Sequence, residues 1–91
     1  MIELITISKA GDTWYLNKVL VSTQHIAMVE ESKEHNHLLS EGKIGLGLNS
    51  QIQFSKIQMA SVSGFNELIA IGSPSAIIEK LGSNKKQLLK G

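Results

Sequence analysis

The chain of 91 residues has no cysteine, no arginine and a single proline. Without cysteine the fold can contain no disulfide, which fits a reducing compartment. Arginine is the side chain that reads guanine edges and grips phosphates through two hydrogen bonds. All nine cations here are lysine, and the net charge is only +1. This composition therefore disfavours a sequence-specific nucleic-acid reader.

Long apolar runs are also missing. No segment approaches the roughly 20 apolar residues that span a bilayer. The N-terminal apolar run is short and carries Glu3, where a signal peptide would carry lysine. We therefore expect a cytoplasmic protein with no membrane span.

The small size of the chain has an energetic consequence. A domain of this length buries only about 60–65% of the surface that its unfolded chain exposes, so its core is marginal. Small folds compensate with disulfides, metals or self-association. With disulfides excluded, we expect a homo-oligomer.

Apolar alternation and β-branched runs predict five strands, at 2–7, 13–16, 24–30, 51–59 and 68–71. Lys9-Ala10-Gly11-Asp12 predicts the turn of a hairpin between the first two. Asn17-Lys18 is expected to interrupt the second strand, before an extended or helical stretch at 19–21. In the third strand, Ile26 and Met28 are expected on one face and Val29 on the other. A change of parity at Ser55-Lys56 predicts a bulge or a strand end.

The clearest local signal lies around the only proline. Ser73 is a preferred N-cap residue, Pro74 suits the first helical position, and Gly82 is suited to end the helix. We therefore predict an α+β fold, a mainly antiparallel sheet of about five strands with one short C-terminal helix packed on it. Residues 1–82 form one domain, with 31–50 as a long loop or insertion. Residues 83–91 are a lysine-rich tail, either disordered or a frayed helix.

Groups suited to catalysis are sparse. Asp12 is the only aspartate, and no Gly-x-Ser-x-Gly elbow is present. His35 and His37 would share one side of an extended segment and could hold a metal with a nearby glutamate, although a solvated loop explains them more simply. We therefore expect no enzymatic activity, no cofactor and no metal.

Two groups of residues are candidates for binding. Glycines allow a backbone to approach a phosphate, although the helix that phosphate loops require does not follow here. A nucleotide or nucleic-acid site would use the loop 42–50 and nearby lysines: Lys43, Gly45, Gly47, Asn49 and Lys56. A protein interface would use the aromatic residues Trp14, Tyr15 and Phe54. Trp14 and Tyr15 are neighbours on a strand, so one is expected in the core and the other at the surface.

Four segments carry a resemblance to a known family: residues 11–17 (GDTWYLN), 26–31 (IAMVEE), 64–71 (GFNELIAI) and 75–81 (SAIIEKL). With them, about two thirds of the chain resembles the small FlbD-like bacterial proteins. It implies a bacterial or phage protein with a flagellar or swarming association, the same order of sheet and helix, and no catalytic residues. Lys18 stands where the family has proline, and 31–50 would be an insertion.

Taken together, the sequence predicts a non-catalytic, homo-oligomeric binding or regulatory protein that acts through contacts with an unidentified protein partner. The alternative is a small-ligand or nucleic-acid binder that uses the loop 42–50, and the absence of arginine ranks it second.

Overall fold

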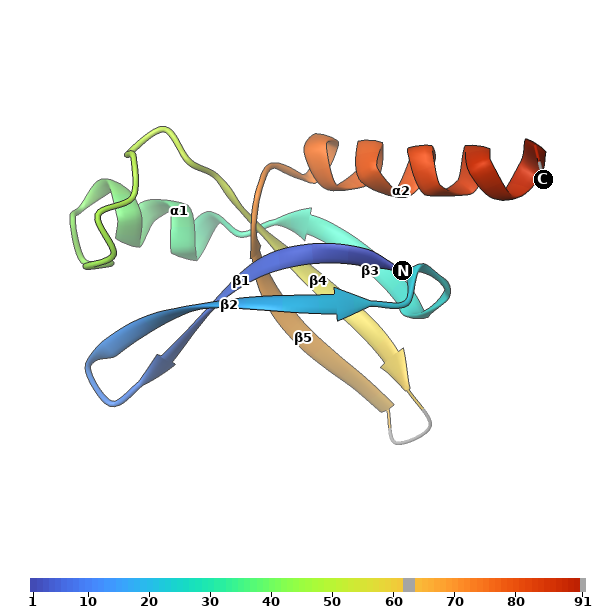
Figure 1. The fold of residues 1–91 in the computed structure, drawn as a ribbon. Helices are drawn as coiled ribbons and strands as arrows, with labels where there is room; N and C mark the ends of the chain where they lie inside the picture. Colours follow the sequence, from blue (N-terminus) through green and yellow to red (C-terminus); the bar gives the residue numbers. More distant parts are fainter. Residues whose placement is uncertain (62–63, 91) are drawn as a thin grey trace.

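The protein forms a five-stranded sheet with helices over parts of it (Figure 1). The computed structural model describes the backbone of residues 1–61 and 64–90, and the side chains of residues 1–60, 64 and 66–82. Every strand pair is antiparallel, and the strand order is β2-β1-β5-β4-β3. The elements are β1 (Ile2–Ala10), β2 (Thr13–Val21), the 3-10 turn η1 (Thr23–His25), β3 (Ile26–Glu31), α1 (Lys33–Ser40), β4 (Phe54–Ser61), β5 (Gly64–Ile71) and α2 (Pro74–Lys90). This confirms the predicted α+β class.

The β1–β2 hairpin is longer than the sequence predicted. Gly11 has a φ of 61°, and among the residues that the structure describes only glycines have a positive φ, so the two-residue turn is of the type that places glycine first. The pairing then runs unbroken from Ala10–Thr13 to Ile2–Val21. Asn17 and Lys18 therefore do not interrupt the strand, because in β2 they face solvent and cost nothing to the core.

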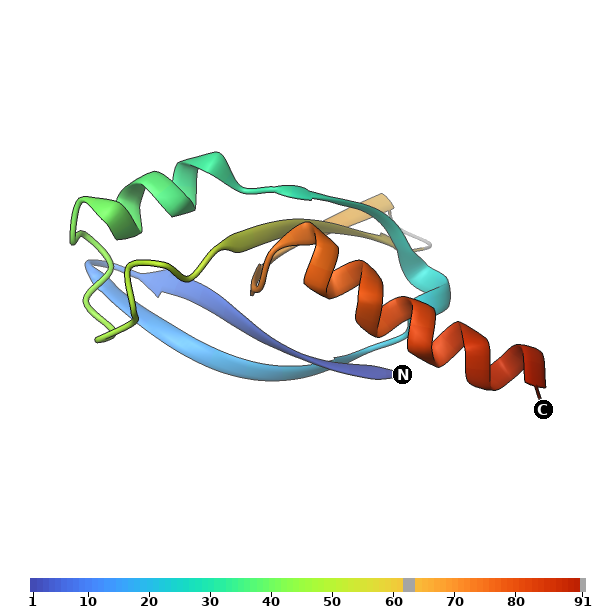
Figure 2. The ribbon, with the colours of Figure 1, turned by 90° about the horizontal axis from the view of Figure 1, so that it is seen from above.

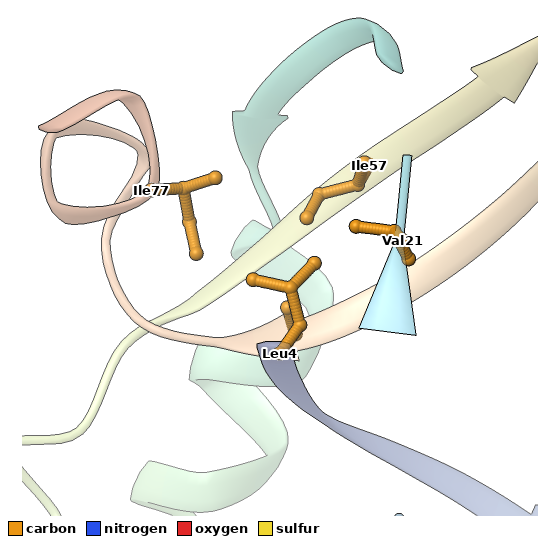
Figure 3. Packing of buried hydrophobic residues seen from close by; sticks show 5 residues of the cluster. Leu4, Val21, Ile57 and Ile77 are labelled. Atoms are coloured by element: carbon orange, nitrogen blue, oxygen red, sulfur yellow. The ribbon is translucent and has the colours of Figure 1, made fainter. Parts of the chain in front are cut away.

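Helix α2 begins as predicted and ends later. The Ser73 hydroxyl accepts a hydrogen bond from the amide of Ala76 at 3.2 Å, which is the expected N-cap. Ile77 points from the helix toward the sheet, where it packs with Leu4 (Figure 3). The prediction that Gly82 ends the helix is wrong, since α2 continues to Lys90. A single glycine within a helix costs only about 1 kcal/mol.

The largest correction concerns residues 31–50, which were predicted as a long loop or insertion: they are not all loop, because residues 33–40 form α1. An isolated eight-residue helix is not stable in water, so contacts with the sheet must hold it. The Asn36 side-chain oxygen accepts a hydrogen bond from the Phe54 amide at 2.6 Å, and Leu39 is buried. Local sequence preference for a helix is weak here, which is why the pattern suggested none.

The sheet carries two apolar clusters. The first joins α2 to the sheet through Leu4, Val21, Ile57, Ala70 and Ile77. The second joins α1 and the following loop to the sheet through Ile7, Leu39, Ile44 and Phe54. Successive residues of a strand point to opposite faces, so Leu4 and Ile7 of β1 place the clusters on opposite faces. In Figure 2, α1 lies near the β1–β2 turn and α2 crosses the other end of the sheet.

Two predictions about strand faces were wrong for related reasons. An extra residue in β3, Ala27, shifts the register against β4, so Ile26 and Val29 share a face. The pairing of β4 with β5 shows no shift at Ser55-Lys56. The parity changes there because both faces of β4 are covered: Phe54 is buried in one cluster and Ile57 in the other.

Candidate interaction surface on strand β2

Strand β2 forms one edge of the sheet and is mostly exposed. Within the described backbone, its nine residues pair only with β1. In Figure 2 most of β2 runs along one margin of the molecule, with β1 beside it. Three large side chains on it are well exposed: Tyr15 (49%), Leu16 (46%) and Leu20 (69%). An uncovered edge strand presents a row of unpaired amides and carbonyls to another strand.

The hairpin turn fixes which backbone groups of β2 point outward. A two-residue turn is closed by a pair that exchanges both hydrogen bonds, here Ala10 and Thr13. Along an antiparallel ladder such pairs alternate with non-bonded ones. The backbone groups of odd-numbered residues in β2 therefore face β1. The outward amides and carbonyls belong to Trp14, Leu16, Lys18 and Leu20.

The side chains of β2 divide between the two faces of the sheet. Trp14 is half-buried, and its ring meets the His35 ring edge-on at a centroid distance of 5.9 Å. The Lys9 ammonium lies 5.4 Å from the centre of the Trp14 ring. Tyr15 points to the opposite face and is exposed, which confirms the predicted division of this aromatic pair. Leu16 and Leu20 share the face of Trp14, as does Ile5 of β1, which is 41% exposed.

His35 joins α1 to this strand. Its ring lies between Trp14 and Phe54, with a centroid distance of 6.2 Å to the latter, and its Nδ1 lies 2.7 Å from the hydroxyl oxygen of Ser32. Burial lowers the pKa of His35, and the charge of Lys56 acts in the same direction; Glu34 and Glu67 oppose them. The neutral ring is therefore favoured, as suits a side chain packed against two aromatic rings.

Phe54 has no exposed surface. The sequence grouped it with Trp14 and Tyr15 as an interface residue, but a fully buried ring offers nothing to a partner. Its role in the structure is to anchor α1, through packing and through the hydrogen bond to Asn36. Phe54 therefore supports the surface that Trp14 belongs to and is not part of it.

The two histidines considered for a metal both lie on α1 but point in different directions. Residues two apart on a helix do not face each other. His35 points into the apolar cluster, whereas His37 is exposed and its Nε2 lies 3.0 Å from a Glu41 carboxylate oxygen. Among the described residues, no three histidine, aspartate or glutamate side chains gather as metal ligands. The extended segment that would have aligned the two rings does not exist.

The glycine-bearing segment packs through its apolar residues. Ile44 is buried, and Leu46 and Leu48 pack beside it, so the intervening glycines Gly45 and Gly47 face solvent. The Lys43 ammonium lies 3.7 Å from Glu41, and the Asn49 side chain accepts a hydrogen bond from the Gln51 amide at 2.8 Å. Lys56 lies on β4, opposite Glu30. A binding role for these five residues (Lys43, Gly45, Gly47, Asn49 and Lys56) stays a prediction.

Leu16 and Leu20 are the surface residues that sequence reasoning missed. The signal was the alternation Trp14, Leu16, Lys18, Leu20, which continues with period two past the expected interruption at Asn17.

No known protein family, curated protein or solved structure matches the chain. Within the ranges 1–61 and 64–90, no helix has the length and apolar character needed to cross a membrane.

Proposed function

We propose that this is a non-catalytic, homo-oligomeric protein that acts through protein–protein contacts, and that β2 is the strand through which it associates. The observation that carries the proposal is the combination on one edge of nine unprotected residues, three exposed large side chains and a single charge, Lys18. Natural edge strands are usually blunted by charges, bulges, proline or a covering element. As far as the described residues go, the β2 edge has no bulge, no proline and no covering element.

The size of the domain supports the same proposal. The two clusters contain only nine buried hydrophobic residues among the described side chains, which is a small core for a chain of this length. Burial of Tyr15, Leu16 and Leu20 against another subunit would add apolar area at about 25 cal/mol per Å². The resemblance to FlbD-like proteins implies the same absence of catalytic groups.

The test compares matched substitutions on the two edges of the sheet. Leu16 on β2 and Met28 on β3 have similar exposure, 46% and 41%. We expect the unaltered chain to sediment as a dimer or larger species at tens of micromolar, Leu16→Lys to sediment as a monomer, and Met28→Lys to behave as the unaltered chain. A monomeric unaltered chain, or equal effects of the two substitutions, would contradict the proposal.

A further inference from the structure

We infer that two copies of the chain pair β2 with β2 in antiparallel orientation about a two-fold axis at Asn17, which joins the two sheets into one of ten strands. This inference rests on the proposed function and specifies its partner, a second copy, and its register. It follows from the backbone geometry, the length and the charge of the strand, each of which limits the registers available.

Symmetry and pleating limit the register first. Paired residues in an antiparallel ladder lie on the same face, and two-fold symmetry requires that one residue be paired with its own copy. Full overlap of the nine residues Thr13–Val21 places the axis at the middle residue, Asn17. Leu16 then pairs with the second copy's Lys18, and these are residues whose backbone groups point outward. The ladder hydrogen bonds of this register therefore use groups that β1 leaves free.

Charge excludes the neighbouring register on one side. An axis at Lys18 would place two ammonium groups directly opposite each other, which is destabilising in a strand pair. An axis at Leu16 avoids that contact but shortens the overlap and leaves Leu20, the most exposed apolar side chain of β2, without a partner. The register at Asn17 pairs Leu20 with the second copy's Trp14, and Tyr15 with the second copy's Val19. Each face of this joint, the pair of β2 strands from the two copies, then carries an aromatic–aliphatic pair.

The absence of cysteine makes this register directly testable. With the axis at Asn17, the two Asn17 residues form a non-hydrogen-bonded pair, whose Cα atoms lie about 4.5 Å apart. That separation lies within the range that a disulfide spans. The Asn17 side chain makes only an exposed hydrogen bond to Ser8, at 2.9 Å, so a cysteine there should be tolerated. The two Thr13 residues would be roughly 27 Å apart, from eight residues at about 3.4 Å each.

The experiment compares Asn17→Cys with Thr13→Cys under mild oxidation at equal concentration. We expect most of the Asn17→Cys protein to become a covalent dimer that reductant reverses, and Thr13→Cys to remain without one on a non-reducing gel. Circular dichroism of both reduced proteins verifies the fold. If Asn17→Cys does not fold, a mixture of Tyr15→Cys and Val19→Cys is expected to form the mixed disulfide, identified by mass spectrometry.

The outcomes separate this inference from the proposed function. If the unaltered chain is a dimer but Asn17→Cys does not crosslink, or Thr13→Cys crosslinks equally, the register at Asn17 is wrong while self-association stands. If the unaltered chain is a monomer by sedimentation, both proposals fail. Selective crosslinking at residue 17 in a chain that sediments as a dimer supports both.

Discussion

The two edges of this sheet are built differently. Strand β2 is nine residues long, regular in register and uncovered. Strand β3 has six residues, carries the extra residue Ala27, ends in Glu30-Glu31 and leads directly into α1. Bulges, charges and short length are the features by which proteins prevent an edge from pairing with another chain. One edge of the sheet therefore carries features that prevent pairing, and the other, which lacks them, is the edge at which we propose that a second strand joins.

Proline substitutions along β2 give the largest expected contrast. Tyr15 directs its amide toward β1, so Tyr15→Pro removes a ladder hydrogen bond and leaves a carbonyl of Ser8 unpaired, at a cost on the order of 1–3 kcal/mol. Lys18 directs its amide outward, so Lys18→Pro keeps the ladder with β1 and blocks the joint with a second copy. We expect Tyr15→Pro to lose its folded circular-dichroism spectrum, and Lys18→Pro to keep the spectrum but sediment as a monomer. A dimeric Lys18→Pro would show that the outer side of β2 is not the joint.

Strand β3 leads directly into α1, and the attachment of α1 to the sheet can be weakened selectively. Asn36→Ala leaves the partly buried Phe54 amide without its acceptor, which should lower the free energy of unfolding by about 1–3 kcal/mol. Asn49→Ala is the matched control, because its hydrogen bond to Gln51 lies in an exposed turn and its loss should cost within about 0.5 kcal/mol. Urea denaturation of both variants measures the difference. Equal losses would mean that α1 is held mainly by other contacts.

Lowering the pH is expected to weaken the packing of α1 on the sheet, by less than Asn36→Ala does. Burial lowers the pKa of His35 in the folded chain, so in the pH window just below about 6.5, the ordinary value for histidine, the unfolded chain binds the proton more readily. Stability therefore falls as the pH drops through that window and is level above it. Thermal melts between pH 7 and pH 5 should show this loss in the unaltered chain and in His37→Gln, whose ring is exposed, and a smaller loss in His35→Gln. An identical pH dependence in both variants would contradict the assignment to His35.

The hairpin and the start of α2 could be predicted from sequence because their signals are local. Residues 9–12 predicted a turn, although Lys9 and Ala10 belong to β1, and Ser73-Pro74 predicted a capped helix start. Helix α1 could not be predicted, since most of the residues in 33–40 are polar and its stability comes from Phe54, far along the chain. The register shift at Ala27 could not be predicted either, because the register depends on how β3 pairs with β4 and the sequence of β3 alone does not specify that pairing.

Only part of the candidate surface on β2 could be predicted from the sequence. The opposite orientations of Trp14 and Tyr15 followed from strand geometry alone. That β2 lies at an edge did not, because the position of a strand in the sheet depends on β1 pairing with β5 on its other side. The exposure of Leu16 and Leu20 follows from that position, and so does their role in the proposed joint.

Amide hydrogen exchange along β2, residue by residue at tens of micromolar, tests the central claim most directly. If a second copy pairs with this strand, the outward amides of Leu16 and Lys18 will be protected as strongly as those of Tyr15 and Asn17, which bond to β1. Fast exchange at Leu16 and Lys18 beside slow exchange at Tyr15 and Asn17 would show that the edge is open to water, and the account would fail.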